Sequence, residues 1–154
     1  MIFKVDTRTG SRTEIERVDG RAHFEFDRTG EGRFRTTWND EDEPILHYRP
    51  AKGSAWTPLP ESIAGRLIYG TQFDPDNNVV YALVTDAGEP AQAYRIDLAA
   101  GTRTKLAGRD DVSMSGFMLE GRNGSPFAVL SFADEPSVQY IKPQSEWAQL
   151  HAGL

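Results

Sequence analysis

The residue of this chain that most resembles a nucleophile is Ser115, in the stretch 113–116. A serine nucleophile of the α/β-hydrolase kind stands in a Gly-x-Ser-x-Gly motif, whose tight turn exposes the hydroxyl group. No two of the 14 glycines lie four positions apart, so the motif is absent. We therefore interpret Ser115 as a structural residue at the start of a strand.

The three histidines, His23, His47 and His151, do not form a metal-binding pattern. None stands at ligand spacing from another, and the zinc motif His-Glu-x-x-His is missing. We interpret all three as surface histidines or hydrogen-bonded core histidines.

Two acidic segments have the oxygen-rich composition that hard cations prefer. Residues 39–43 read Asn-Asp-Glu-Asp-Glu, and Asp74, Asp76 and Asn78 occupy the first three ligand positions of a calcium loop. The loop's glycine and distant glutamate are missing, however, and both segments fall where turns are expected. We interpret both segments as turns. With the interpretations of Ser115 and the histidines, the sequence predicts no metal ligand, no cofactor-binding residue and no catalytic residue.

The elements that carry these residues recur with a period of 45 to 46 residues. Glu-Pro occurs at 43–44, 89–90 and 135–136, and an aromatic residue follows at Tyr48, Tyr94 and Tyr140, with Phe3 a further 45 residues back. Such a period filled with short strands is typical of β-propeller blades. The strict spacing of the tyrosines favours packing between blades over a stacking platform for bases or sugars.

Each full repeat contains four predicted strands. In the third repeat the first ends at 71–74, and the others span 79–85, 91–97 and 102–106, with turns rich in Pro, Asp, Asn and Gly between them. The second repeat gives strands at 22–27, 32–39, 45–49 and 54–59, and the last gives three, at 112–119, 126–132 and 138–142. Ser145 then caps a predicted helix over 145–150.

The fold class predicted is all-β: a partial β-propeller of about three four-stranded antiparallel blades with a short C-terminal helix. We expect a single propeller segment, 1–154, made of the back half of a blade (1–20), two blades (21–64 and 65–110) and a partial blade with the helix (111–154). Residues 58–65 are the only candidate spacer. The chain holds about 3.3 repeats, whereas a propeller closes with about 4–8 blades.

Composition excludes several function classes. The net charge of −6 and the absence of a basic stripe argue against nucleic-acid binding. The longest apolar run has six residues, which is too short to span a bilayer. Without cysteines or a signal peptide, the sequence favours a soluble protein, cytoplasmic rather than secreted.

Four arginines lie within the predicted strands: Arg33, Arg35, Arg49 and Arg95. We interpret them as members of surface or cross-strand ion pairs.

The repeat sequence also resembles a known family. Residues 72–83 (Gln-Phe-Asp-Pro-Asp-Asn-Asn-Val-Val-Tyr-Ala-Leu) and 93–106, the Asp-Thr-Arg-Thr-Gly of 6–10, and the ending Tyr140 to Pro143 before a helix resemble the N-terminal β-propeller of the prolyl oligopeptidase family of serine peptidases, in the acylaminoacyl-peptidase and dipeptidyl aminopeptidase branch. The resemblance covers essentially the whole chain. It implies a non-catalytic propeller segment that restricts access of peptide substrates to a separate α/β-hydrolase domain.

Two functions follow as hypotheses. In the first, the chain shapes substrate access and docks the α/β-hydrolase catalytic domain of the same parent chain, so its partners are that domain and the parent's peptide substrate. In the second, it is a stand-alone propeller-like binding or scaffold protein completed by self-association, a homo-oligomer through open blade edges.

Overall fold

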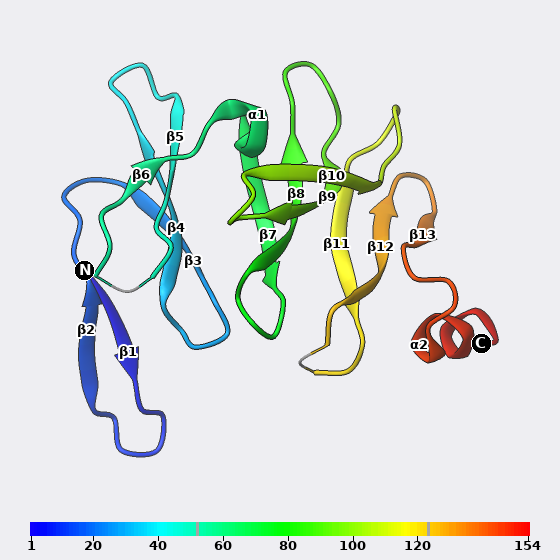
Figure 1. Ribbon diagram of the computed structural model, residues 1–154, viewed down its shortest axis with the longest axis horizontal. Coiled ribbons are helices and arrows are strands. Elements are labelled where there is room, and N and C mark those ends of the chain that lie inside the picture. The colour runs from blue at the N-terminus through cyan, green and yellow to red at the C-terminus, as the bar shows by residue number, and fades with distance from the viewer. Residues whose placement is uncertain (52, 123) are drawn as a thin grey trace. The chain divides into compact units, whose positions relative to one another are not determined.

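The computed structural model describes residues 1–51, 53–122 and 124–154. The chain forms two compact units, Met1–Pro58 and Leu59–Leu154, and each is described here by itself. The described residues form thirteen strands and two short helices (Figure 1). All sheets are antiparallel and their strands follow one another in sequence order, as in the blades of a propeller.

The first unit contains a hairpin and a four-stranded sheet. The hairpin pairs the two N-terminal strands, and the sheet follows directly, with Phe24 and the fully buried Phe34 in its interior. The hairpin strands are β1 (Ile2–Val5) and β2 (Arg12–Glu16), and the sheet strands are β3 (Ala22–Phe26), β4 (Gly32–Trp38), β5 (Pro44–Tyr48) and β6 (Thr57–Pro58).

Two buried arginines hold the first unit together. The Arg33 guanidinium pairs with Asp27 at 3.0 Å, and Arg49 pairs with Glu16 on β2, with every one of these side chains largely withdrawn from solvent. Arg49 Nε also donates to the carbonyl oxygen of Gly32 at 2.7 Å. A buried ion pair costs much desolvation energy, which these additional hydrogen bonds offset. The Arg49–Glu16 pair thus ties the hairpin to the four-stranded sheet.

The second unit contains a four-stranded sheet, a three-stranded sheet and both helices. Two strands of the four-stranded sheet are mostly buried, and their Val, Ala, Leu and Ile residues are all withdrawn from solvent. The elements are α1 (Glu61–Ala64), β7 (Leu67–Phe73), β8 (Val79–Thr85), β9 (Gln92–Asp97), β10 (Thr102–Ala107), β11 (Met114–Leu119), β12 (Pro126–Phe132), β13 (Pro136–Tyr140) and α2 (Glu146–Ala152).

The two sheets of the second unit share one apolar core. Leu83 and Ala93 of the first sheet pack against Met114 and Val129 of the second, with Ala107 at the edge of the cluster. Backbone bonds reinforce this contact, since Met114 N donates to Ala91 O at 2.8 Å. Face-to-face burial of this kind is how neighbouring blades stabilise one another.

Aspartates end the strands in a repeated way. Asp6, Asp27, Asp74 and Asp97 each stand at a hairpin turn and accept backbone N–H groups of the turn through Oδ1. The carboxylate replaces the hydrogen bonds that the backbone loses where it leaves the sheet. The period of the sequence therefore corresponds to a period of turns as well as of strands.

The strand pattern differs from the sequence-based expectation in two places. The fourth strand expected over 54–59 is reduced to Thr57–Pro58, because Pro58 and Pro60 lack the amide protons needed to extend a ladder. The expected spacer 58–65 contains α1, one helical turn that ends at Gly65. The helix over 145–150 forms as α2, and Ser145 caps it by accepting from Ala148 N at 3.2 Å.

Candidate functional site

The serine region is structural in the second unit. Ser113 Oγ accepts from Ala91 N at 3.0 Å, and Ser115 Oγ donates to the carbonyl oxygen of Leu130 at 3.1 Å. Ser113 thus helps to join the two sheets, and Ser115 bonds to the neighbouring strand. Neither of these bonds involves a histidine, the usual base that activates a serine nucleophile.

The histidines lie in different settings. His23 Nε2 lies 3.2 Å from the Glu25 carboxylate on the surface of β3, and His47 faces Arg35 across β4 and β5. Burial, and then the charge of Arg35, lower the pKa of His47. His151 belongs to α2, in the other unit. Within the described ranges, no group of three or more His, Cys, Asp or Glu residues could hold a metal ion.

The acidic segments form turns. Asn39 Oδ1 accepts from the amides of Glu41 and Glu43 at 3.0 and 2.8 Å. Asp74 Oδ1 accepts from the amides of Asn78 and Val79 at 2.8 and 2.9 Å. Asn39 and Asp74 therefore each use a side-chain oxygen to accept from backbone N–H groups of their own turns.

The strand arginines are more buried than the sequence indicated. Arg33 and Arg49 form the buried ion pairs of the first unit, and Arg95 lies 3.9 Å from Asp97 in a partly exposed pair. Arg35 stacks over the Trp56 ring, with its Cζ 4.9 Å from the ring centroid. Arg33, Arg49 and Arg95 therefore form ion pairs as expected, but those of Arg33 and Arg49 are buried.

The periodic tyrosines pack, but within their own sheets or against α2. The Tyr48 ring lies 5.4 Å from that of Phe34, and Arg103 covers the Tyr94 ring at 4.6 Å. The Tyr140 hydroxyl lies 2.8 Å from Nδ1 of His151. The sequence therefore predicted correctly that these tyrosines pack. It placed their partners in neighbouring blades, whereas the contacts described here lie in the same sheet or on α2.

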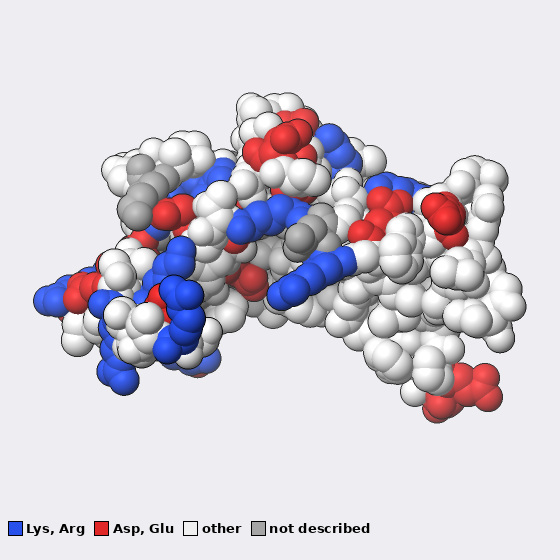
Figure 2. Space-filling view, turned by 90° about the horizontal axis from the view of Figure 1, so that it is seen from below, with Lys and Arg blue, Asp and Glu red and all other residues white. Residues whose placement is uncertain are grey.

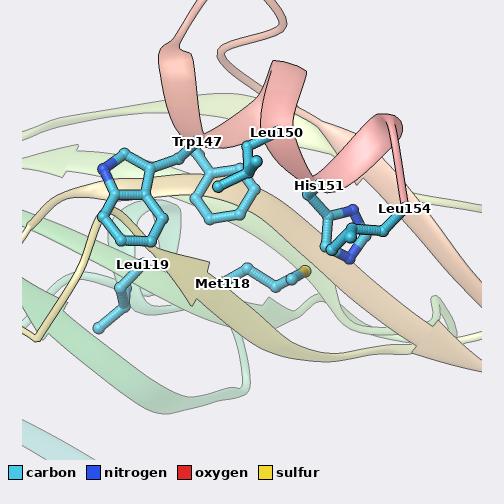
Figure 3. Close-up of a pocket in the computed structure, with 7 residues that line it drawn as sticks. Met118, Leu119, Trp147, Leu150, His151 and Leu154 are labelled. Carbon is cyan, nitrogen blue, oxygen red and sulfur yellow. The ribbon is translucent and has the colours of Figure 1, made fainter.

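An apolar pocket lies in the second unit, at a place that the sequence did not indicate. Its cavity volume is about 330 Å³, which lies within the range of about 300–1,000 Å³ of small-molecule sites. Figure 3 shows α2 forming one wall and the sheet the opposite wall. The lining residues are Met118, Leu119, Phe127, Trp147, Leu150, His151 and Leu154.

The pocket exists because α2 covers only part of a sheet face. Met118, Ala128 and Tyr140 are register partners across the second sheet, on the face opposite Val129 and the shared core. Ala148 is the buried contact of α2 on this face. A helix whose one buried residue is a small alanine leaves the larger side chains beside it partly uncovered.

Large apolar side chains remain exposed around the pocket. Trp147 is 45% exposed and Leu150 is 62% exposed. The right-hand end of Figure 2, the end that carries α2, is dominated by uncharged atoms. Trp147, Leu150 and Leu154 stand at i, i+3 and i+7, which is the sequence signal that could have indicated an apolar helix face.

A second unusual feature is the unequal size of the sheets. β11–β13 has three strands and β1–β2 has two, whereas the other two sheets have four. β13 is the last strand of its sheet, and no other strand that the structure describes pairs with its far side, which is therefore an open edge. Neither helix of the described chain is long or apolar enough to cross a membrane.

Comparison with known proteins shows no family for this chain. No family model matches the chain, and no curated protein matches it either. Among solved structures, the chain is similar to TolB from Acinetobacter baumannii, with a TM-score of 0.48 and 15% sequence identity. That alignment covers 91% of this chain and 35% of the TolB chain, so the protein spans about a third of the TolB chain.

Proposed function

We propose that this chain is a non-catalytic scaffold or binding module whose unfinished sheets are completed by a second copy of the chain. The observation that supports this function is the difference in strand number: three strands in β11–β13 and two in β1–β2, beside two sheets of four. An incomplete sheet exposes unpaired backbone groups, which are a template for another strand.

The open edge of β13 has the groups that strand addition requires. Ile141 N donates to Phe127 O, and the alternation of an antiparallel ladder then directs the amides of Gln139 and Ser137 toward β12. The amides of Val138 and Tyr140 accordingly face away from the sheet. An added strand would gain main-chain hydrogen bonds at these two positions.

The hairpin β1–β2 supplies the complementary element. Its strands align in the repeat with the third and fourth strands of a blade, and Phe3 and Val5 are 42% and 48% exposed. A two-stranded sheet is at best marginally stable by itself. One chain thus carries both the open edge of β13 and the exposed hairpin β1–β2. In a head-to-tail association, the hairpin of one copy would pair with the β13 edge of the next.

The association is tested by light scattering over a range of protein concentrations. We expect a mass above that of the 17.2 kDa monomer that rises with concentration. Val138→Pro removes an outward amide and should restore the monomer, whereas Val138→Ala keeps the amide and should still associate. A strict monomer at all concentrations, or equal behaviour of the two variants, contradicts self-association.

A second candidate function is the propeller part of a prolyl-oligopeptidase-like serine peptidase, a hydrolase. Its support is the repeat sequence, Gln72 to Leu83 and Ala93 to Leu106 above all. In this role the module docks a separate α/β-hydrolase domain and limits peptide access to it. A Gly-x-Ser-x-Gly domain encoded in the same reading frame would support it. Peptide or ester hydrolysis by this chain alone that Ser115→Ala abolishes would contradict the non-catalytic role in both candidates.

A further inference from the structure

We infer that the α2 pocket binds a small aromatic compound that carries a hydrogen-bond acceptor such as a carboxylate. This inference concerns a site separate from the strand edges and does not rest on the proposed self-association. Its first support is shape: an open cavity of about 330 Å³ between two strands and a helix (Figure 3). That volume accommodates one ring with a short substituent, and it is too small to hold a folded protein element.

The lining selects for an aromatic group. Phe127 and Trp147 contribute rings, Met118 contributes a thioether, and three leucines complete the apolar lining. Aromatic rings favour offset or edge contacts with one another, and a methionine sulfur packs well against a ring edge. The backbone of Gly121 also lies close to the Trp147 ring, since a Cβ added at Gly121 would be 3.5 Å from Cζ2 of Trp147.

The single polar residue of the lining is oriented as a ligand-binding group. Nδ1 of His151 lies 2.8 Å from the Tyr140 hydroxyl, which fixes the ring, and the Phe127 ring centroid lies 6.3 Å away. The other ring nitrogen, Nε2, has no hydrogen bond to any residue that the structure describes and is open to solvent. When Tyr140 donates to Nδ1, the neutral ring carries its proton on Nε2 and donates to an acceptor there.

These features together resemble a ligand site more than a bare apolar patch. Small-molecule sites combine an apolar lining with a few placed polar groups. The aromatic walls would hold the ring of the ligand, and Nε2 of His151 would bind its acceptor at the rim. A compound of about ten heavy atoms should bind with a dissociation constant on the order of 1 mM.

The three methionines provide a test within the intact chain. Met118 lines the pocket, Met114 is buried in the core between the sheets, and Met1 stands at the N-terminus. With ¹³C-methyl-labelled methionine, phenylacetate should shift the Met118 methyl signal saturably and leave those of Met114 and Met1 in place. Acetate, which has the carboxylate but no ring, should shift none of them.

Variants distinguish the parts of the site. His151→Phe keeps a ring but removes both the Nε2 donor and the Nδ1 bond to Tyr140, and it should weaken phenylacetate binding by at least about ten-fold. Leu150→Gln removes one apolar wall at an exposed position and should also weaken binding. Phe132→Ser is the matched control, because Phe132 is 57% exposed on the same sheet and does not line the pocket.

Three results would overturn the inference. The first is a Met118 signal that does not move with phenylacetate. The second is equal binding by Leu150→Gln and Phe132→Ser. The third is a Met118 signal that shifts with protein concentration in the absence of any compound, because this would assign the pocket to a second copy of the chain.

Discussion

The Tyr140 hydroxyl and Nδ1 of His151 lie 2.8 Å apart, and this hydrogen bond connects the last strand to the last helix. The two rings also meet at an interplanar angle of 68°, with centroids 5.8 Å apart. α2 otherwise depends on the Ser145 cap and the burial of Ala148. One side-chain pair is therefore a main determinant of where α2 lies and of whether the pocket exists.

We expect Tyr140→Phe to loosen α2 without unfolding the sheets. Loss of one partly buried hydrogen bond should cost about 1 kcal/mol. Amide hydrogen exchange should therefore become faster in α2 and stay unchanged in the buried strand β8. Equal protection of α2 in the variant and the original chain would show that the bond does not position the helix.

Gly65 is the glycine whose replacement should be most costly among those with positive φ. Its φ is +60°, and a Cβ there would lie 2.5 Å from Val84 Cγ1 and 2.6 Å from the Thr85 carbonyl oxygen. Gly65→Ala adds a steric clash to backbone strain and should lower the free energy of unfolding by at least about 2 kcal/mol.

Gly88 supplies the control for this experiment. It has a φ of +76° in the same unit, but a Cβ there would meet nothing within 4 Å. Gly88→Ala should therefore lower the free energy of unfolding by only about 1 kcal/mol, the cost of placing an alanine at positive φ. Denaturant unfolding of the two variants separates strain from steric exclusion, and equal losses would refute the close approach at Gly65.

Asp27 neutralises a buried arginine, so its charge should matter. Burial raises the pKa of Asp27, but hydrogen bonds from Thr29, Arg33 and two backbone amides outweigh burial and leave the pKa below its usual value. Asp27→Asn leaves the Arg33 charge buried without its carboxylate partner and should cost about 3 kcal/mol of stability in the first unit.

Asp42 tests whether burial of the ion pair is the reason for the stability loss expected of Asp27→Asn. It pairs with Arg21 at 3.3 Å on the surface, where the two side chains are 79% and 67% exposed. Asp42→Asn should change the free energy of unfolding by less than about 1 kcal/mol. A loss as large as that of Asp27→Asn would contradict the difference between buried and exposed pairs.

His47 should make the first unit sensitive to mild acid. Burial and the Arg35 charge lower the pKa of His47 in the folded state below the unfolded value of 6.5. The unfolded chain then binds the proton more readily, so the contribution to stability is complete above pH 6.5 and is lost as the pH falls below it. His47→Gln should reduce the drop in melting temperature between pH 7 and pH 5.

The exposed His23 is the comparison for this measurement. His23→Gln is the matched substitution at a histidine that is 61% exposed and pairs with Glu25 on the surface. If the two variants show the same slope of melting temperature against pH, the buried position of His47 is not the cause.

The sequence by itself determined the local elements. The alternation of residues 22–26, the β-branched run 79–85 and the turn residues after Asp74 predict strands and turns, since each depends on neighbours within a few positions. Ser145 likewise predicts the start of α2 through a bond to Ala148, only three residues away. The all-β fold of blade-like sheets could be predicted for the same reason, because the strands and turns follow from local sequence patterns.

The tertiary structure decided the features that depend on residues far apart in the chain. Arg49 reaches Glu16 across 33 positions, so its burial could not be read from the sequence around it. The α2 pocket depends on which face of β11–β13 the helix covers and on how little of it Ala148 fills. Periodicity determines which residues point together, but the packing between elements determines what remains uncovered, because it depends on the shapes of both surfaces.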